Sequence, residues 1–331
     1  MLILSRPDVE SLLTMPAAIA AVGEGFRQLA LGNVVMPQRV ATSIAPHDGL
    51  HLSMPAFVGS ENPEEAGTLT IKIVTVYGHN QTRFGLPMVQ GMLLLHDACN
   101  GQLLAMMDAE HLTAMRTGAA SGVATEYLAR PDAATVLLFG AGALGPQQLA
   151  AVCAVRPIQR ALVITKSGEK DAEFCAQMSS KLGITVEATR DTQSAIRNAD
   201  IICTATNSTE PLFDGHWLKP GTHINAVGAY TAKMREVDTT TIQRSRIFVD
   251  HHKAAQTEAG DILLPIANHE FSYDQVAGEL GALINGTVVG RTRDDEITLF
   301  KSVGLALQDA VTAAQVYKLA LERGTGQQID L

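Results

Sequence analysis

The chain has 331 residues, of which 46% are hydrophobic and 18% are charged, and its formal net charge is −9. This length is sufficient for two domains, and the composition is that of a globular protein rather than a disordered one. No cluster of Lys or Arg offers a surface for nucleic acid or for an anionic membrane, so we expect neither partner.

The cysteines and the apolar segments give no sign of an extracellular or membrane protein. Cys99, Cys153, Cys175 and Cys203 include no C-x-x-C pair, which argues against a disulfide framework and a structural zinc site. No apolar run reaches the ~18 residues of a membrane helix, and the first residues lack the apolar core of a signal peptide. We therefore expect a cytoplasmic protein that binds no metal.

The first third of the sequence predicts helices followed by short strands. Ser5 and Asp8 can cap a first helix, and a second helical pattern runs from Ala17 to Leu31. Between Arg39 and Asp97 the pattern changes to β-like runs separated by Gly, Pro and Asn, and Asn100-Gly101 is typical of a hairpin. This region is expected to form a mostly antiparallel sheet with flanking helices.

The sequence changes character after a helical stretch, Glu110 to Ala129, that is rich in small residues. Arg130-Pro131-Asp132 ends this stretch. From Ala134 onward, apolar runs alternate with helical ones, which predicts βαβ units and a parallel sheet. The segment from Ile297 to Arg323 is expected to be one long amphipathic helix that packs back on the first domain. The predicted fold class is α/β, with a Rossmann-type doubly wound parallel sheet beside an α+β domain.

A glycine-rich loop directly follows the first apolar strand of this second region. Gly140, Gly142 and Gly145 fit the pattern G-x-G-x-x-G, which also contains Ala143 and Leu144. A strand before the loop and a helix after it are the context that a dinucleotide-binding loop needs. Gly140 allows the tight turn, Gly142 lets the backbone approach a pyrophosphate, and Gly145 lets helix and strand pack closely. A tight turn without a ligand is the alternative.

The end of the next strand bears on the choice of nicotinamide cofactor. NAD-binding chains usually carry an acidic residue there, which holds the ribose hydroxyls. In this sequence the strand ends in Thr165, Lys166 and Ser167, so no carboxylate is expected at this position, although Glu169 could fold back. Two hydroxyls and a cation suit a 2′-phosphate. The pattern therefore favours NADP(H) over NAD(H), unless Lys166 is simply solvated.

Many short motifs follow one another in a fixed order between Pro37 and Leu331. They are MPAF at Met54, TIKIV around Lys72, LP at Leu86, LTAMRTGAAS from Leu112, GAG at Gly140, CTAT at Cys203, WLKPGTHINAVGA from Trp217, MREVD from Met234, EAGD at Glu258 and LFKSVGLALQD from Leu299. In this order the motifs resemble those of the ornithine cyclodeaminase/mu-crystallin family.

The resemblance implies a homodimer with two domains in each chain. Residues 1–117, completed by 305–331, would bind substrate and build the dimer, and residues 118–304 would form the Rossmann domain that binds NAD(P). Family members include cyclodeaminases, alanine dehydrogenases, ketimine and 1-pyrroline-2-carboxylate reductases, and thyroid-hormone-binding crystallins. The expected function is therefore NAD(P)H-dependent reduction of small α-imino acids, including reductive amination of a 2-oxo acid such as pyruvate. Ornithine cyclodeamination and non-catalytic binding of a carboxylate ligand are the alternatives.

Three basic residues are candidates for contact with such a substrate. Lys72 lies in an apolar strand, on the side of Val74 and Val76, and a buried ammonium group usually has a partner or a task. By resemblance, Lys72 lies beside the substrate carboxylate and serves proton transfer, and Arg116 binds that carboxylate. Lys72 and Arg116 are thus the candidate catalytic residues. Arg39 is the expected second arginine, although a surface role fits it nearly as well.

Two positions depart from the cyclodeaminase pattern. Tyr230 stands where these enzymes place an aspartate base, and Leu52 stands where they carry a glutamate. Without these carboxylates the distal ammonium group of ornithine lacks its partner, which disfavours cyclodeaminase activity. Tyr230 is kept as a candidate substrate contact. The remaining predicted cofactor contacts, which rest on the family motifs, are Thr117, Thr204, Ala205, Thr206, Val227, Gly228 and Ser302.

Overall fold

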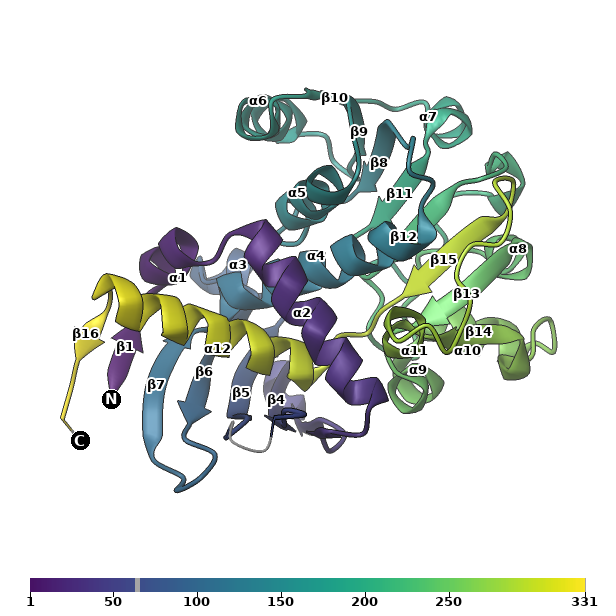
Figure 1. The fold of residues 1–331 in the computed structure, drawn as a ribbon. Helices are drawn as coiled ribbons and strands as arrows, with labels where there is room; N and C mark the ends of the chain where they lie inside the picture. The colour runs from purple at the N-terminus through teal and green to yellow at the C-terminus, as the bar shows by residue number, and fades with distance from the viewer. Residues whose placement is uncertain (63–65, 331) are drawn as a thin grey trace. The chain divides into compact units, whose positions relative to one another are not determined.

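The computed structural model describes residues 1–62 and 66–330, and the chain divides into two compact units. Unit 1 consists of Met1–Arg116 and Leu305–Leu331, and unit 2 consists of Thr117–Gly304. Each unit is built around one sheet (Figure 1). Within the described residues, no helix combines the length and the apolar character needed to cross a membrane. The cytoplasmic location stays a prediction.

The sheet of unit 1 is mixed and mainly antiparallel, as the pattern of short runs predicted. β1 and β7 run parallel, and the other neighbouring strands are antiparallel. In pairing order the strands are β16 (Gln327–Gln328), β1 (Leu2–Leu4), β7 (Leu103–Asp108), β6 (Val89–His96), β5 (Thr68–Tyr77), β4 (Gly49–Val58) and β2 (Val34–Val35), with β3 (Val40–Ile44) paired to β4.

Two helices, α2 (Met15–Ala30) and α12 (Ala306–Arg323), lie across this sheet and pack on one of its faces (Figure 1). Because side chains alternate along a strand, the buried residues in the middle of β4, β5 and β6 are every second one, and these point to the helices. The short helix α1 (Arg6–Leu12) begins at the predicted cap, where the side chains and backbones of Ser5 and Asp8 bond reciprocally. β6 and β7 form the predicted hairpin, in which Gly101 supplies a positive φ of 78°.

Unit 2 contains an eight-stranded sheet in which every pair of neighbouring strands is parallel. Its strands, in pairing order, are β10 (Thr185–Ala188), β9 (Arg160–Ile164), β8 (Thr135–Phe139), β11 (Ile201–Thr204), β12 (His223–Ala226), β15 (Ile297–Lys301), β13 (Ser245–Val249) and β14 (Val276–Glu279). The chain builds outward from β8 in one direction and then returns to continue from β11 in the other. This reversal is the switch point of a doubly wound sheet, and it confirms the predicted fold class.

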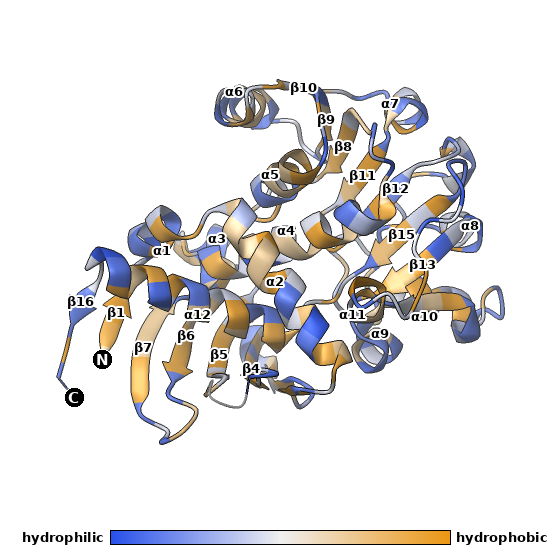
Figure 2. Cartoon of the chain, viewed as in Figure 1, coloured by the Kyte–Doolittle hydropathy of each residue, from blue (hydrophilic) through white to orange (hydrophobic). Residues whose placement is uncertain are grey.

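Both faces of the parallel sheet are buried, as doubly wound sheets require. Leu137 and Phe139 belong to one apolar core, and their neighbours Val136 and Leu138 belong to another. Hydrophobic residues accordingly concentrate on the strands, whereas the loops and outer helix surfaces are hydrophilic (Figure 2). These near-continuous apolar strands are the apolar runs that alternate with helical stretches in the sequence.

The prediction of one helix from Ile297 to Arg323 is wrong in its first part. Ile297–Lys301 is the strand β15, and the helix α12 begins only at Ala306. Between them the chain turns at Gly304, which has a φ of 81°. The buried carboxylate of Asp250 accepts the N–H groups of Val303 and Gly304 in this turn. A short, fully buried strand cannot be distinguished from a helical segment by periodicity alone.

Candidate functional site

Unit 1 buries a lysine in the middle of its sheet. Lys72 belongs to β5, pairs with Met54 and Leu93 of the neighbouring strands, and is only 2% exposed. It faces the helix side of the sheet, as its alternation with Val74 predicted. Its Nζ lies 2.8 Å from Oδ2 of Asp309 and donates a hydrogen bond of 3.3 Å to Oγ1 of Thr113.

The carboxylate of Asp309 holds a second cation. Arg116, on α4 (Ala109–Leu128), donates from Nε to Oδ1 of Asp309 at 3.0 Å and from Nη1 to Oε1 of Gln308 at 2.8 Å. Asp309 lies in the first turn of α12 and is 1% exposed. One buried carboxylate therefore bridges two buried cations that come from a strand and from a helix far apart in the sequence.

This environment sets the pKa of Lys72 to about 7. Burial is the largest cause of the lowering, because it disfavours the charged amine. Asp309 opposes the shift, and the positive charges of Arg116 and Arg39 add to it. Arg39, in the loop between β2 and β3, is thus close enough to act on Lys72. A lysine of this pKa exchanges its proton near neutral pH, which suits a general acid or base.

Asp309 and Gln308 are residues of this cluster that the sequence analysis did not single out. Both lie in the motif LFKSVGLALQD, whose last two residues begin the buried face of α12. Ala306, Ala310 and Ala313 make that face apolar. A carboxylate on the apolar face of a predicted helix is a signal of a functional residue, and helical periodicity would have shown it for Asp309. Within the described residues, the Nε2 group of the buried Gln308 has no hydrogen-bond partner.

The glycine loop of unit 2 has the geometry that a dinucleotide needs. Gly140 has a φ of 96°, and a Cβ there would lie 2.6 Å from the carbonyl oxygen of Ala205. A Cβ on Gly145, the first residue of α5 (Gly145–Val155), would lie 2.6 Å from the carbonyl oxygen of Gly140. Around Gly142, by contrast, a Cβ would meet no atom within 4 Å. The loop is therefore tight on the protein side and open where a pyrophosphate would approach.

The other predicted residues of the loop and of α4 lie close to this turn. Ala143 is exposed and Leu144 is half-buried, immediately before α5. Thr117 is buried on α4. A Cβ on the next residue, Gly118, would lie 2.5 Å from the carbonyl oxygen of Gln147, so the backbones of α4 and α5 are in direct contact.

The loops after β11 and β12 carry the next group of predicted cofactor residues. A Cβ on Gly228 would lie 2.2 Å from the carbonyl oxygen of Thr206, so the two loops also meet backbone to backbone. The hydroxyls of Thr204 and Thr206 donate to Glu236, and that of Ser302 donates to Asp250. Because these hydroxyls are engaged within the protein, we expect backbone groups to make the contacts with a cofactor. Val227 is buried, Ala205 is half-exposed, and Tyr230 follows as a half-buried residue.

The end of β9 differs from the expectation of a site without a carboxylate. Asp171 folds back and accepts a hydrogen bond of 2.5 Å from Oγ1 of Thr165. The exposed Arg190, which the sequence analysis did not identify, donates from Nη2 to Asp171 and from Nη1 to the carbonyl oxygen of Thr165. The negative charge of Asp171 is therefore paired with the positive charge of Arg190. Lys166 and Ser167 remain exposed beside it. The acid was missed because it lies seven residues beyond the end of β9, after a turn in which Gly168 has a positive φ of 80°.

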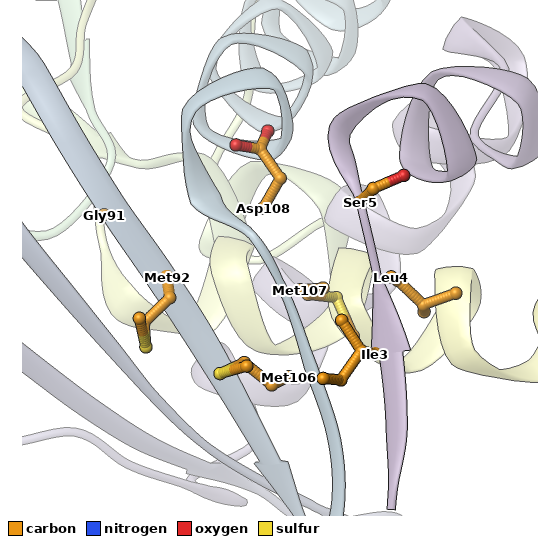
Figure 3. Close-up of a pocket in the computed structure, with 8 residues that line it drawn as sticks. All are labelled: Ile3, Leu4, Ser5, Gly91, Met92, Met106, Met107 and Asp108. Carbon is orange, nitrogen blue, oxygen red and sulfur yellow. The ribbon is translucent and has the colours of Figure 1, made fainter. Parts of the chain in front are cut away.

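A shallow hollow of about 200 Å³ in unit 1 lies apart from the Lys72 cluster. Its apolar side is formed by Ile3, Met92 and Met106, which Figure 3 shows next to one another, with Ser5 and Asp108 at the far end. No grouping of three or more His, Cys, Asp or Glu side chains suited to a metal ion occurs in the described part of the chain.

A doubly wound sheet whose switch point carries this glycine loop defines a dinucleotide-binding protein, to which unit 1 adds a buried lysine, arginine and aspartate. Within that class, the chain belongs to the ornithine cyclodeaminase/mu-crystallin family, whose model matches residues 1–324.

Known relatives are similar over their whole length. A Delta(1)-pyrroline-2-carboxylate reductase of Bacillus cereus is 35% identical over 331 residues, which is 100% of both chains. The structure of the Thermococcus litoralis enzyme of that name, in complex with NADH and L-proline, is 40% identical with a TM-score of 0.94, covering 99% of this chain and 100% of its own. An archaeal alanine dehydrogenase dimer with bound NAD is 33% identical with a TM-score of 0.92, covering 100% of this chain and 99% of its own.

The bridging role of Asp309 leads to a prediction about stability. Asp309→Ala leaves two buried cations without a counter-charge, so we expect it to lower the free energy of unfolding by about 3–5 kcal/mol. Lys72→Met removes one of the cations and leaves Asp309 paired with Arg116, so its cost should stay below about 1.5 kcal/mol. Urea denaturation of both variants measures the difference. Equal losses would contradict the shared-carboxylate arrangement.

Proposed function

We propose that the chain is an NAD(P)H-dependent reductase of small α-imino acids, with ketimines, 1-pyrroline-2-carboxylate, or the imine of pyruvate and ammonia as substrates. The observation that carries the proposal is the buried cluster of Lys72, Arg116 and Asp309, in which a lysine has a pKa of about 7. Relatives that match the chain end to end are named as pyrroline-2-carboxylate reductases and alanine dehydrogenases. A reaction that adds hydride to carbon and a proton to nitrogen needs a group of this kind.

The roles of the side chains follow from their charges. A bound nicotinamide would supply hydride to the imine carbon. Lys72 would supply the proton to the imine nitrogen and would be recharged from solvent. Arg116, whose Nη2 has no acceptor in the described part of the chain, and Arg39 would hold the substrate carboxylate, because guanidinium groups bind carboxylates with fixed orientation. Asp309 would keep the two cations in place.

The structure around Lys72 also argues against a cyclodeaminase. Leu52 is buried on the helix side of the sheet, two residues from Met54, the direct cross-strand partner of Lys72. An apolar side chain at this position offers no partner for a distal ammonium group. Reduction of an imine with no second amine is therefore the better fit.

Turnover with imine substrates tests the proposal directly. The protein is to be incubated with NADPH or NADH and with 1-pyrroline-2-carboxylate, or with pyruvate and ammonia, while the nicotinamide absorbance is followed. We expect turnover, and we expect Lys72→Met to lower kcat about 100-fold or more while cofactor affinity is unchanged, because a proton donor is lost. Cofactor binding without turnover of any imine would support a non-catalytic binding protein instead.

The pH profile distinguishes a proton donor from a merely structural lysine. Because Lys72 must be protonated to act as the acid, kcat/KM should be constant below its pKa of about 7 and should fall as the pH rises above it. The variant Lys72→Met should retain low activity that does not fall in this pH range. If the fall in kcat/KM persists in the variant, another group supplies the proton.

We also infer that NADP(H) is preferred over NAD(H). Lys166 and Arg190 put two positive charges at the end of β9, and the carboxylate of Asp171 is already bound to Arg190 and to the hydroxyl of Thr165. A 2′-phosphate there gains a charge-assisted contact with Lys166, whereas a ribose diol would have to share Asp171 with Arg190 and Thr165.

Competing titrations of the two cofactors test this preference. We expect a lower Michaelis constant for NADPH than for NADH, by about tenfold, since one such contact contributes roughly 1–2 kcal/mol. Lys166→Asp should reverse the order. Lys181→Asp, which makes the same charge change in the last turn of α6 (Asp171–Leu182), is the control and should leave the order unchanged. Tighter NADH binding by the wild type would contradict the inference.

The uncovered face of the unit 1 sheet supports a homodimer. Opposite the face that α12 covers, Pro55, Ile71, Leu94, Met106 and Ile3 are direct cross-strand partners and form an apolar row across five strands. All five are only partly buried within one chain. An apolar row of this length is typical of an interaction surface, and a second copy of the chain can present the same row to it.

Light scattering of the purified protein and of two variants tests the homodimer. Met92, on the same face, is 44% exposed, and Leu321, on α12, is 61% exposed. We expect the wild type and Leu321→Glu to be dimeric and Met92→Glu to be monomeric at low concentration, because only the second substitution buries a charge between two copies. A monomeric wild type would contradict the proposal.

A further inference from the structure

Glu236 is a fully buried carboxylate that neither the sequence motifs nor the proposed reaction explains. It lies in the motif MREVD, after the loop that follows β12. Its Oε1 accepts hydrogen bonds from the N–H group of Thr206 at 2.6 Å and from the hydroxyl of Thr206 at 2.7 Å. Its Oε2 accepts from the hydroxyl of Thr204 at 2.8 Å and from the N–H groups of Gly228 at 2.7 Å and Ala229 at 3.1 Å.

These bonds join the ends of two adjacent strands. Thr204 is the last residue of β11 and Thr206 lies in the loop after it, whereas Gly228 and Ala229 follow β12. Both loops lie at the carboxyl edge of the parallel sheet, where ligands of doubly wound folds bind. The first loop also touches the glycine loop, since a Cβ on Gly140 would lie 2.6 Å from the carbonyl oxygen of Ala205.

The backbone of Glu236 is itself held in place by a second motif, EAGD. Oδ1 of Asp261 accepts the N–H groups of Glu236 and Val237, and its Oδ2 lies 2.8 Å from Nζ of Lys301. Lys301 in turn donates to the carbonyl oxygen of Ala229 at 2.6 Å. A Cβ on Gly260 would lie 2.1 Å from the carbonyl oxygen of Met234, so only glycine allows this approach. The charged chain of Lys301, Asp261 and Glu236 is buried throughout.

We infer that Glu236 is a positioning residue for the nicotinamide half of the cofactor, because it sets the backbone of the two loops beside which that half would lie. The inference rests on the proposed cofactor site. The adenosine half of a dinucleotide would lie at the end of β9, where Thr165 and Lys166 are found. The hydrogen bonds described for the Glu236 carboxylate go instead to the end of β11 and to the loops after β11 and β12. Glu236 therefore acts on one half of the cofactor only.

A carboxylate is needed here for a specific reason. Three of the five donors are backbone N–H groups, which cannot reverse their direction. In Glu236→Gln, the amide NH2 must face either the N–H group of Thr206 or those of Gly228 and Ala229. Either orientation sets donor against donor and displaces one loop.

The experiment compares the full dinucleotide with ADP, which contains only the adenosine side. We expect Glu236→Gln to raise the Kd of NADPH and of NADH by about tenfold or more, which corresponds to about 1.4 kcal/mol, and to leave the Kd of ADP unchanged. Calorimetric titration measures these constants. The melting temperature of each variant is recorded in parallel.

Asp200→Asn is the matched control. Asp200, which directly precedes β11, also accepts two backbone N–H groups, but these belong to Ala134 and Thr135 at the beginning of β8, the opposite edge of the sheet from the two loops. This variant should lower the melting temperature while leaving the Kd values of both dinucleotides and of ADP unchanged.

Two results would overturn the inference while keeping the cofactor site. In the first, Glu236→Gln binds the dinucleotides like the wild type; in the second, it weakens ADP and dinucleotides equally. A wild type that binds ADP, NADPH and NADH not at all would instead overturn the proposed cofactor site, and the inference with it.

Discussion

The arrangement of unit 1 depends on one buried carboxylate, that of Asp309. A lysine in the middle of an apolar strand and an arginine in a helix of small residues would each be costly to bury alone. Asp309 contacts both, at 2.8 Å and 3.0 Å. Because this residue lies near the end of the chain, α12 has to return from unit 2 and pack on the first sheet before the cluster is complete. The charged cluster of unit 1 therefore forms only when the C-terminal helix has packed on the first sheet.

Unit 2 uses the same device at the carboxyl edge of its sheet. Glu236 joins the loops after β11 and β12, Asp261 and Lys301 join β15 to that second loop, and Asp250 closes the turn after β15. Glu236 and Asp250 accept backbone N–H groups of residues that follow parallel strands, and Asp261 accepts those of Glu236 and Val237. Hydrogen bonds to a charged acceptor are stronger than neutral ones, so loops that must be open to a ligand on one side can be rigid on the other.

The sequence predicted those features that repeat or that need a particular residue. The alternation of apolar runs with helical stretches predicted the parallel sheet, and the alternation of side chains along β5 predicted the side to which Lys72 points. The spacing of the glycines predicted the loop after β8. Contacts between distant segments left no local pattern, so Asp309, Arg190 and Asp171 were missed. Asp171 in particular lies beyond a turn, outside the three residues that the sequence places at the end of the strand. β15 was assigned to a helix because a short apolar run has no period of its own.

The charges around Lys72 also suggest how substrate binding would prepare the proton donor. Lys72 and Arg116 together carry more positive charge than Asp309 can balance, so the cluster favours an anion. A substrate carboxylate bound by the arginines would offset the two charges that lower the pKa of Lys72, and that pKa would rise. Lys72 would then hold its proton more firmly in the complex than in the free protein. The acid would be more fully charged when an imino acid is present to receive its proton.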